Sequence, residues 1–252
     1  MVPGHETIGD IVALGPDETL WKVGDRVGGA WHGGHDDAEY VALRREAAVR
    51  VPKDLDPVEY APVLCAGVTT FNGIRQMGIT PGELVVIQGL GGLGHLALQY
   101  AAKMGFRVVA LSSRPGKEAF AKEFGATDYI DASSEDPVAK LQSMGGAALI
   151  VATAPDAKAI APLTGALQPG GKLLILAPVG EIPFNVNHLV LEATSIHGWP
   201  SGASLDSEEA LEFTKLQHVK CLIERFPLQD AQKAYDHMMS GKVRYRAVLV
   251  PE

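Results

Sequence analysis

The sequence predicts an α/β protein with a doubly wound parallel sheet, flanked by a smaller part rich in β-structure. Three observations support this prediction. From residue 82 to about residue 196, short apolar runs alternate with helical patterns, as in successive β-α-β units. The chain has 252 residues, of which 46% are hydrophobic and 21% charged, which suits a globular protein with a sizeable core. A glycine-rich turn also separates the first of these strands from the first helix.

That turn lies in the stretch 83–113, around which the rest of the chain is organised. An apolar run leads into Gly89-Leu90-Gly91-Gly92-Leu93-Gly94, and a helical pattern and a second apolar run follow. Strand, glycine turn, helix and strand form the context of a dinucleotide fingerprint, in which the helix N-terminus faces the phosphates. We expect Gly89 to permit the tight turn, Gly91 to admit a pyrophosphate and Gly94 to allow close helix–strand packing. The alternative is a purely structural glycine turn, since the chain has 28 glycines.

Six strands are predicted in this region, the number found in the two βαβαβ halves of a Rossmann domain. They cover residues 84–87, 107–111, 127–130, 148–152, 172–176 and 194–197. The helices expected between them cover residues 93–104, 115–124, 136–144, 156–167 and 186–192.

The segments before and after this region show a different pattern of expected elements. Before the glycine turn we expect extended segments or strands at residues 5–14, 26–31, 39–43 and 48–51, and a helix at 65–77. Asp56 is placed to cap a short helix that begins at Pro57. After the sixth strand we expect a helix at 207–216, a strand at 221–225, a helix at 230–239 and a strand at 245–250.

Composition excludes several classes of protein. The net charge is −8 and Lys and Arg form no cluster, which argues against a nucleic-acid or anionic-membrane partner. No apolar run approaches the ~18 residues of a membrane span, and the first residues resemble neither a signal peptide nor a basic presequence. The two cysteines, Cys65 and Cys221, make no disulfide framework, so we expect a cytoplasmic protein.

Several landmarks fall in the order of a known family. They are Gly4-His5-Glu6, Lys22–Val27, Ala38-Glu39-Tyr40, Cys65–Thr70, Gly89–Gly94 and Gly241-Lys242-Val243 with Arg246. The chain resembles the zinc-dependent medium-chain dehydrogenase/reductase superfamily, the alcohol dehydrogenase and cinnamyl-alcohol-dehydrogenase-like enzymes. The resemblance implies a GroES-like barrel in residues 1–65, a Rossmann domain in residues 66–199, and residues 200–252 returning to the barrel domain. It also implies hydride transfer between a nicotinamide cofactor and a small-molecule alcohol or carbonyl compound, and it leaves a homo-oligomer open.

The resemblance also implies a metal site. His5 and Cys65 match two ligands of the family's catalytic zinc, and Glu6 matches the carboxylate beside the metal. A catalytic zinc takes three protein ligands and keeps one position open to polarise a substrate oxygen. Taken alone, His5 and Cys65 would be ordinary structural residues. Trp31 matches a wall residue of the alcohol pocket, although a buried core tryptophan is an equal alternative.

The departures from the family pattern are also informative. The family's glycine-x-cysteine stretch, which carries the first zinc ligand, lies upstream of Gly4 and is absent, and the cysteine-rich lobe expected before Ala38 is absent too. A shortened gene product, or a start codon and exon wrongly called, fits both losses. For a chain truncated at its N-terminus we expect an incomplete barrel that exposes apolar strands, no structural zinc and a weakened catalytic zinc site. His32 and His35 near Asp36 and Asp37 are better interpreted as a solvated turn than as substitute ligands.

The end of the second Rossmann strand predicts the nucleotide. An Asp or Glu there would accept from the ribose hydroxyls of NAD and repel a 2′-phosphate, but this chain has Ser112. Ser113, Arg114 and Lys117 follow, and hydroxyls with cations suit a dianionic phosphate. NADP is therefore predicted over NAD, with ordinary surface charges as the alternative. The further cofactor-binding residues that the pattern suggests are Thr69, Gly92, Leu93, Ala154, Ala177, Val179, Trp199 and Arg246. His95 is expected on the surface at the start of the helix, with a contact to the phosphate as the alternative.

Three functions remain open from the sequence. The first is an NADP-dependent zinc-type alcohol dehydrogenase. The second is a catalytically inactive NADP-binding remnant that acts as an interaction protein. The third is a zinc-free carbonyl or enoyl reductase, against which His5 and Cys65 argue.

Overall fold

The computed structural model describes residues 4–29, 38–113 and 116–251. The chain divides into two compact units. Unit 1 comprises Met1–Val68 and Ser201–Glu252, and unit 2 comprises Thr69–Pro200. Unit 2 is thus one continuous segment, whereas unit 1 is assembled from the two flanks of the chain. The domain boundaries at residues 65 and 199 stay predictions.

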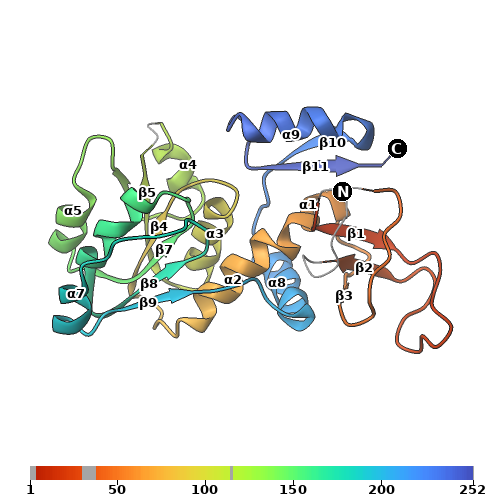
Figure 1. The fold of residues 1–252 in the computed structure, drawn as a ribbon, viewed down its shortest axis with the longest axis horizontal. Coiled ribbons are helices and arrows are strands. Elements are labelled where there is room, and N and C mark those ends of the chain that lie inside the picture. The colour runs from red at the N-terminus through yellow and green to blue at the C-terminus, as the bar shows by residue number, and fades with distance from the viewer. Residues whose placement is uncertain (1–3, 30–37, 114–115, 252) are drawn as a thin grey trace. The chain divides into compact units, whose positions relative to one another are not determined.

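Unit 2 contains a six-stranded parallel sheet with the strand order β6-β5-β4-β7-β8-β9 (Figure 1). The strands are β4 (Leu84–Gln88), β5 (Arg107–Ser112), β6 (Asp128–Asp131), β7 (Ala147–Ala152), β8 (Leu167–Ile175) and β9 (Ser195–Gly198). The chain runs outward from β4 to β6 and then returns to β7 on the other side of β4. The carboxyl ends of β4 and β7 therefore form the switch point at which ligands of such sheets bind.

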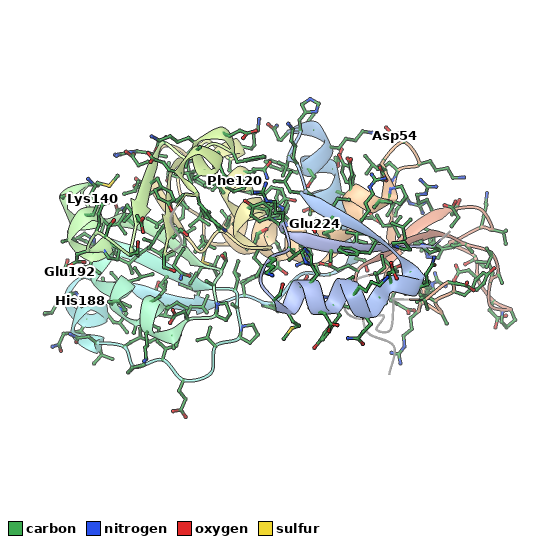
Figure 2. The ribbon with its side chains drawn as sticks, turned by 90° about the horizontal axis from the view of Figure 1, so that it is seen from above. Asp54, Phe120, Lys140, His188, Glu192 and Glu224 are labelled. Atoms are coloured by element: carbon green, nitrogen blue, oxygen red, sulfur yellow. The ribbon has the colours of Figure 1, made fainter. Side chains whose placement is uncertain are left out.

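Helices cover both faces of this sheet. The helical elements of the unit are α3 (Gly94–Lys103), α4 (Glu118–Glu123), α5 (Pro137–Ser143), α6 (Ala157–Ile160), the 3₁₀ helix η2 (Ala161–Ala166), α7 (Val186–Leu191) and most of α2 (Ala66–Gln76). Val85 and Ile87 pack with α2, α3 and α4, while Leu84 and Val86 pack with α5, α6 and η2. Both sides of the strands are buried, which explains their continuous apolar runs. The exposed side chains of Lys140 and Glu192 lie on the outer sides of the helices (Figure 2).

Local sequence explains where several helices begin. Asp56 accepts a hydrogen bond from the Val58 amide at 2.9 Å, as predicted for a helix that starts at Pro57. Asp136 caps α5 in the same way, with Val138 N at 2.9 Å. The predicted helix 156–167 is instead split into α6 and η2. Pro162 has no N–H for an α-helical bond, which accounts for the change to 3₁₀ geometry.

Unit 1 contains two small sheets. The first is antiparallel, with β1 (Thr7–Asp10), β2 (Arg26–Gly29) and β3 (Ala48–Arg50), and the second is the parallel pair β10 (Ile223–Pro227) and β11 (Arg246–Val250). Its helical elements are α1 (Pro57–Tyr60), η1 (Ala61–Leu64), α8 (Ser204–Leu216), η3 (Leu228–Asp230) and α9 (Ala231–Met239). Within the described residues, β1, β10 and β11 each pair with a single neighbouring strand. None of the described helices combines the length with the hydropathy that a membrane span requires.

One predicted strand of unit 1 is wrong. Residues 39–43 form no regular structure, and Tyr40 is 75% exposed. The segment is largely apolar, but among the described residues no neighbouring strand pairs with it, and a strand requires such a partner. The turn 32–37, Trp31 and Arg114 lie outside the described residues, so predictions about them stay untested.

Candidate active site

Three potential metal ligands meet in unit 1. His5 and Glu6 directly precede β1, and Cys65 lies between η1 and α2. The Nε2 atom of His5 is 3.1 Å from the Sγ atom of Cys65. The potential ligand atoms of His5, Glu6 and Cys65 all lie within 4.8 Å of one another. The fold thus brings together two residues that are 60 positions apart in the sequence.

Glu6 is fixed by two further contacts. Its Oε1 atom accepts from the Ala66 amide at 3.1 Å, at the N-terminus of α2, where a negative charge is favourable. Its Oε2 atom pairs with the Arg246 guanidinium of β11 at 2.5 Å. Burial by itself would lower the pKa of Arg246, but the Glu6 carboxylate outweighs it, so the pKa lies above its ordinary value. Arg246 therefore stays charged and holds the carboxylate in place.

The donor set fits a zinc ion. An imidazole nitrogen, a thiolate sulfur and a carboxylate oxygen are the ligands that Zn²⁺ uses in catalytic sites. His5 is exposed and Cys65 half-buried, so the cluster is open to solvent on one side. Both oxygens of Glu6 already accept hydrogen bonds, which makes this residue the weakest of the three ligands.

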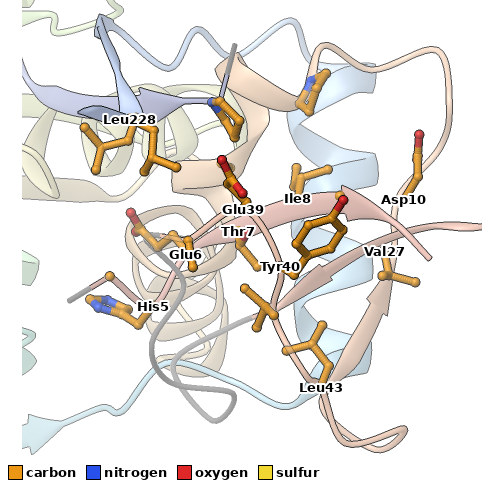
Figure 3. Close-up of a pocket in the computed structure, with 18 of the residues that line it drawn as sticks. His5, Glu6, Thr7, Ile8, Asp10, Val27, Glu39, Tyr40, Leu43 and Leu228 are labelled. Carbon is orange, nitrogen blue, oxygen red and sulfur yellow. The ribbon is translucent and has the colours of Figure 1, made fainter. Parts of the chain in front are cut away.

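Two members of the cluster, His5 and Glu6, line a cavity of about 1290 Å³ within unit 1. Figure 3 shows His5, Glu6 and Tyr40 among its lining residues, together with apolar side chains such as Ile8 and Leu228. Trp21 also lines the cavity, and its buried Nε1 atom has no hydrogen-bond partner in the described part of the chain. The site is therefore large enough for a small organic molecule next to the potential metal ligands.

The glycine turn of unit 2 is shaped by close packing. Gly89 has a φ of +88°, which favours glycine, and a Cβ there would lie 2.7 Å from the Ala154 Cβ. A Cβ on Gly94 would lie 1.9 Å from the Gly89 carbonyl oxygen. A Cβ on Gly91 would meet nothing within 4 Å. The turn thus needs glycine at two positions for packing and leaves open space at the third.

Polar contacts beside the turn, made by Gln88 and Thr153, were missed by the sequence analysis. The Thr153 hydroxyl, just after β7, lies 2.9 Å from the Gln88 carbonyl oxygen and 3.0 Å from that of Gly89. The Gln88 side chain accepts from the Ala154 amide at 3.3 Å. These bonds tie together the ends of β4 and β7 at the switch point. The available indication was that Gln88 ends the buried strand β4 and Thr153 directly follows the buried strand β7.

The residues predicted to select the nucleotide gather around the end of β5. Ser112 is buried, Ser113 is exposed, and the Lys117 ammonium donates to the Leu90 carbonyl of the glycine turn at 2.6 Å. Burial raises the pKa of the Tyr129 hydroxyl, and a hydrogen bond with Ser112 acts in the opposite direction. Tyr129 is thus a further residue that positions Ser112.

The other predicted cofactor residues are distributed over both units. Gly92, Leu93, Ala154, Ala177 and Val179 follow carboxyl ends of strands in unit 2. Thr69 is buried in α2, and Trp199 packs on the core of unit 2. Arg246 belongs to unit 1, where it pairs with Glu6. The predicted position of His95 is wrong, because its side chain is 0% exposed.

Comparison with known proteins identifies the family. Residues 1–53 match the alcohol dehydrogenase GroES-like domain, and residues 92–215 match the zinc-binding dehydrogenase family. An alcohol dehydrogenase of Penicillium expansum, patD, is 53% identical over 276 residues, which cover 99% of this chain and 81% of the relative. The chain belongs to the zinc-type medium-chain alcohol dehydrogenases.

Further relatives of this dehydrogenase agree with that assignment. An alcohol dehydrogenase of Geobacillus stearothermophilus is 34% identical, covering 99% of this chain and 82% of the relative. The solved cinnamyl alcohol dehydrogenase of Sorghum bicolor superposes with a TM-score of 0.84 at 26% identity, covering 98% of this chain and 81% of that one. The alignment with patD has 276 positions, whereas this chain has 252 residues. At least 276 − 252 = 24 aligned positions of patD therefore have no counterpart in this dehydrogenase.

The predicted family and fold class are therefore confirmed. This alcohol dehydrogenase is an oxidoreductase that interconverts small-molecule alcohols and carbonyl compounds with a nicotinamide cofactor. The assignment of individual site residues stays a prediction.

Proposed function

We propose that this protein is an NADP-dependent alcohol dehydrogenase that interconverts an alcohol with an aldehyde or ketone by hydride transfer. The observation that carries the nucleotide preference is the environment at the end of β5, where Ser112 stands in place of a carboxylate. In the oxidation direction, the alcohol carbon gives a hydride to the nicotinamide ring and the hydroxyl oxygen gives up a proton.

Charge at this position decides between the two nucleotides. An acidic side chain would bind the ribose of NAD and repel the 2′-phosphate of NADP. The Ser112 and Ser113 hydroxyls can instead donate to a phosphate, and charge-assisted bonds from a cation such as Lys117 are stronger still. Lys117 is held beside the glycine turn by its bond to the Leu90 carbonyl. This arrangement supports an adenosine 2′-phosphate between β5 and the turn.

We further propose that His5, Cys65 and Glu6 would hold a catalytic zinc ion, which supplies polarisation of the substrate oxygen. The approach of His5 to Cys65 within 3.1 Å supports this role. Arg246 and the Ala66 amide orient the Glu6 carboxylate toward the cluster. The apolar cavity would exclude water from around a bound substrate.

The test is the Ser112→Asp variant. We expect its ratio of kcat/KM for NADPH over NADH to fall by at least about tenfold with an aldehyde substrate, because a carboxylate repels the 2′-phosphate. Ser143→Asp adds the same charge at the end of α5, shortly before β7 begins, whereas Ser112 lies at the carboxyl end of β5. This control variant should leave the ratio unchanged. A wild-type enzyme that already prefers NADH would contradict the proposal.

A further inference from the structure

His95 is a buried polar residue at the start of α3 for which the site described above gives no role. Its side chain is 0% exposed although it follows directly on Gly94. The His95 backbone N–H donates to the Gly91 carbonyl at 3.0 Å. The Nδ1 atom of the same residue lies 3.2 Å from the same oxygen. Because a carbonyl oxygen only accepts, Nδ1 must carry the proton and donate.

Two donors from one residue thus hold the Gly91 carbonyl on the inner side of the turn. The backbone of His95 is itself braced, because the Gln99 side chain donates to its carbonyl at 2.9 Å. Nδ1 of His95 therefore acts as a donor to the Gly91 carbonyl.

The orientation of the next amide follows from this arrangement. The peptide bond between Gly91 and Gly92 is planar and trans, so its carbonyl and its N–H point in opposite directions. With the carbonyl held inward, the Gly92 N–H points outward from the turn. The adjoining residue Gly91 is exposed, and a Cβ there would meet nothing within 4 Å, so this side of the turn has open space beside the amide. An amide that points into open space at a helix N-terminus is set to donate to a phosphate.

We infer that His95 is a positioning residue that orients the Gly92 amide toward the diphosphate of the nicotinamide cofactor. This inference rests on the proposed binding of the cofactor at Gly89–Gly94. It does not depend on the choice between NADP and NAD, because both nucleotides carry the same diphosphate.

The test compares His95→Leu, which removes the donor, with His95→Asn, whose amide nitrogen occupies the place of Nδ1. Dissociation constants are measured by fluorescence titration for NADPH, NADH and adenosine 2′-monophosphate, which lacks the diphosphate. We expect His95→Leu to weaken NADPH and NADH equally, by about tenfold, since one hydrogen bond to a charged group is lost. Adenosine 2′-monophosphate should bind as before, and His95→Asn should restore most of the affinity for both dinucleotides.

A matched control separates positioning from general stability. Thr214 of α8 makes the same type of bond, from its side chain to the carbonyl four residues earlier, with Oγ1 2.6 Å from the Ala210 oxygen. Thr214→Val should lower the melting temperature without changing any of the three dissociation constants. If His95→Leu fails to fold, His95→Gln takes its place, because its amide reaches the position of Nε2 and not that of Nδ1.

Two results would overturn the inference. One is a His95→Leu or His95→Gln enzyme that is less stable but binds both dinucleotides like the wild type. The other is an equal loss for adenosine 2′-monophosphate, which would indicate a general disturbance of the sheet edge. A wild-type preference for NADH would contradict the proposed nucleotide choice and still leave the effect of His95 measurable with NADH.

Discussion

Replacing Gly94 by alanine tests how tightly α3 is packed against the glycine turn. The added Cβ would lie 1.9 Å from the Gly89 oxygen, and real Cβ contacts are essentially never shorter than 3.0 Å, so the two groups must separate by at least 3.0 − 1.9 = 1.1 Å. Gly89 cannot easily retreat, because its φ is +88° and its carbonyl lies 3.0 Å from the Thr153 hydroxyl. The strain therefore has to be taken up by α3 or by the end of β4.

The magnitude follows from opposing contributions. Overpacking a close contact costs about 1–3 kcal/mol, and loss of the Thr153 hydrogen bond costs about 1 kcal/mol. Alanine recovers up to about 1 kcal/mol through its higher helix propensity. We expect a net loss near 2 kcal/mol, which corresponds to a drop in melting temperature of about 4–8 °C. NADPH should also bind more weakly, because the amides of the turn are displaced.

The assay is urea unfolding followed by circular dichroism, together with NADPH titration. Gly91→Ala is the matched control, since its Cβ meets no atom within 4 Å. That variant should keep wild-type stability but lose at least about tenfold in NADPH affinity, because the methyl group occupies the space proposed for the diphosphate. A Gly94→Ala protein as stable as the wild type would refute the packing argument, and unchanged NADPH affinity in Gly91→Ala would refute the proposed position of the diphosphate.

Three further predictions concern the metal site, the half-buried Cys221 thiol and a helix cap. After dialysis the protein should hold less than one zinc per chain by elemental analysis, because both Glu6 oxygens already accept hydrogen bonds. The Cys65→Ser variant should hold still less zinc. One tightly held zinc per wild-type chain would contradict this prediction. Burial raises the pKa of Cys221 to about 12. Below that pH the rate of its alkylation by iodoacetamide, followed by mass spectrometry, should therefore rise about tenfold for each unit by which the pH is raised. A rate that levels off near neutral pH would be inconsistent with this pKa. Asp136→Ala should destabilise the protein by about 1 kcal/mol in urea unfolding, and no change would argue against the cap.

The sheet of unit 2 was predictable because the apolar sequence of each strand indicates a buried strand without reference to distant residues. Residues such as Val85, Val86 and Ile87 are apolar without interruption and are 0% exposed, since helices cover both faces of the sheet. The glycine turn was predictable for a related reason, because no other residue type fits at Gly89 and Gly94. In both cases the physical requirement acts on residues that are adjacent in the sequence.

Features that depend on distant partners were harder to predict. Residues 39–43 are largely apolar, as a strand can be, but no strand in the described part of the chain pairs with them. The side chain of His95 turns inward because the Gly91 carbonyl accepts from it, and the helical pattern alone does not show that rotation. The junction of Thr153 with Gln88 required the neighbouring positions of β4 and β7. The approach of His5 to Cys65 was expected only through the family resemblance, because no spacing rule joins residues 60 positions apart.

The split organisation of unit 1 has a consequence for how the protein folds during synthesis. Unit 2 is a single segment that ends at Pro200, so all of its strands are synthesised before β10 and β11. Unit 1 cannot be completed until Arg246 reaches Glu6, which is 240 residues earlier in the chain. The apolar surface of the first residues therefore stays exposed until the last strand has been synthesised. Contacts between residues so far apart in the sequence slow folding and favour aggregation. A nascent chain that stops short of β11 would leave the Glu6 carboxylate without its cation, so the potential metal site would be finished last.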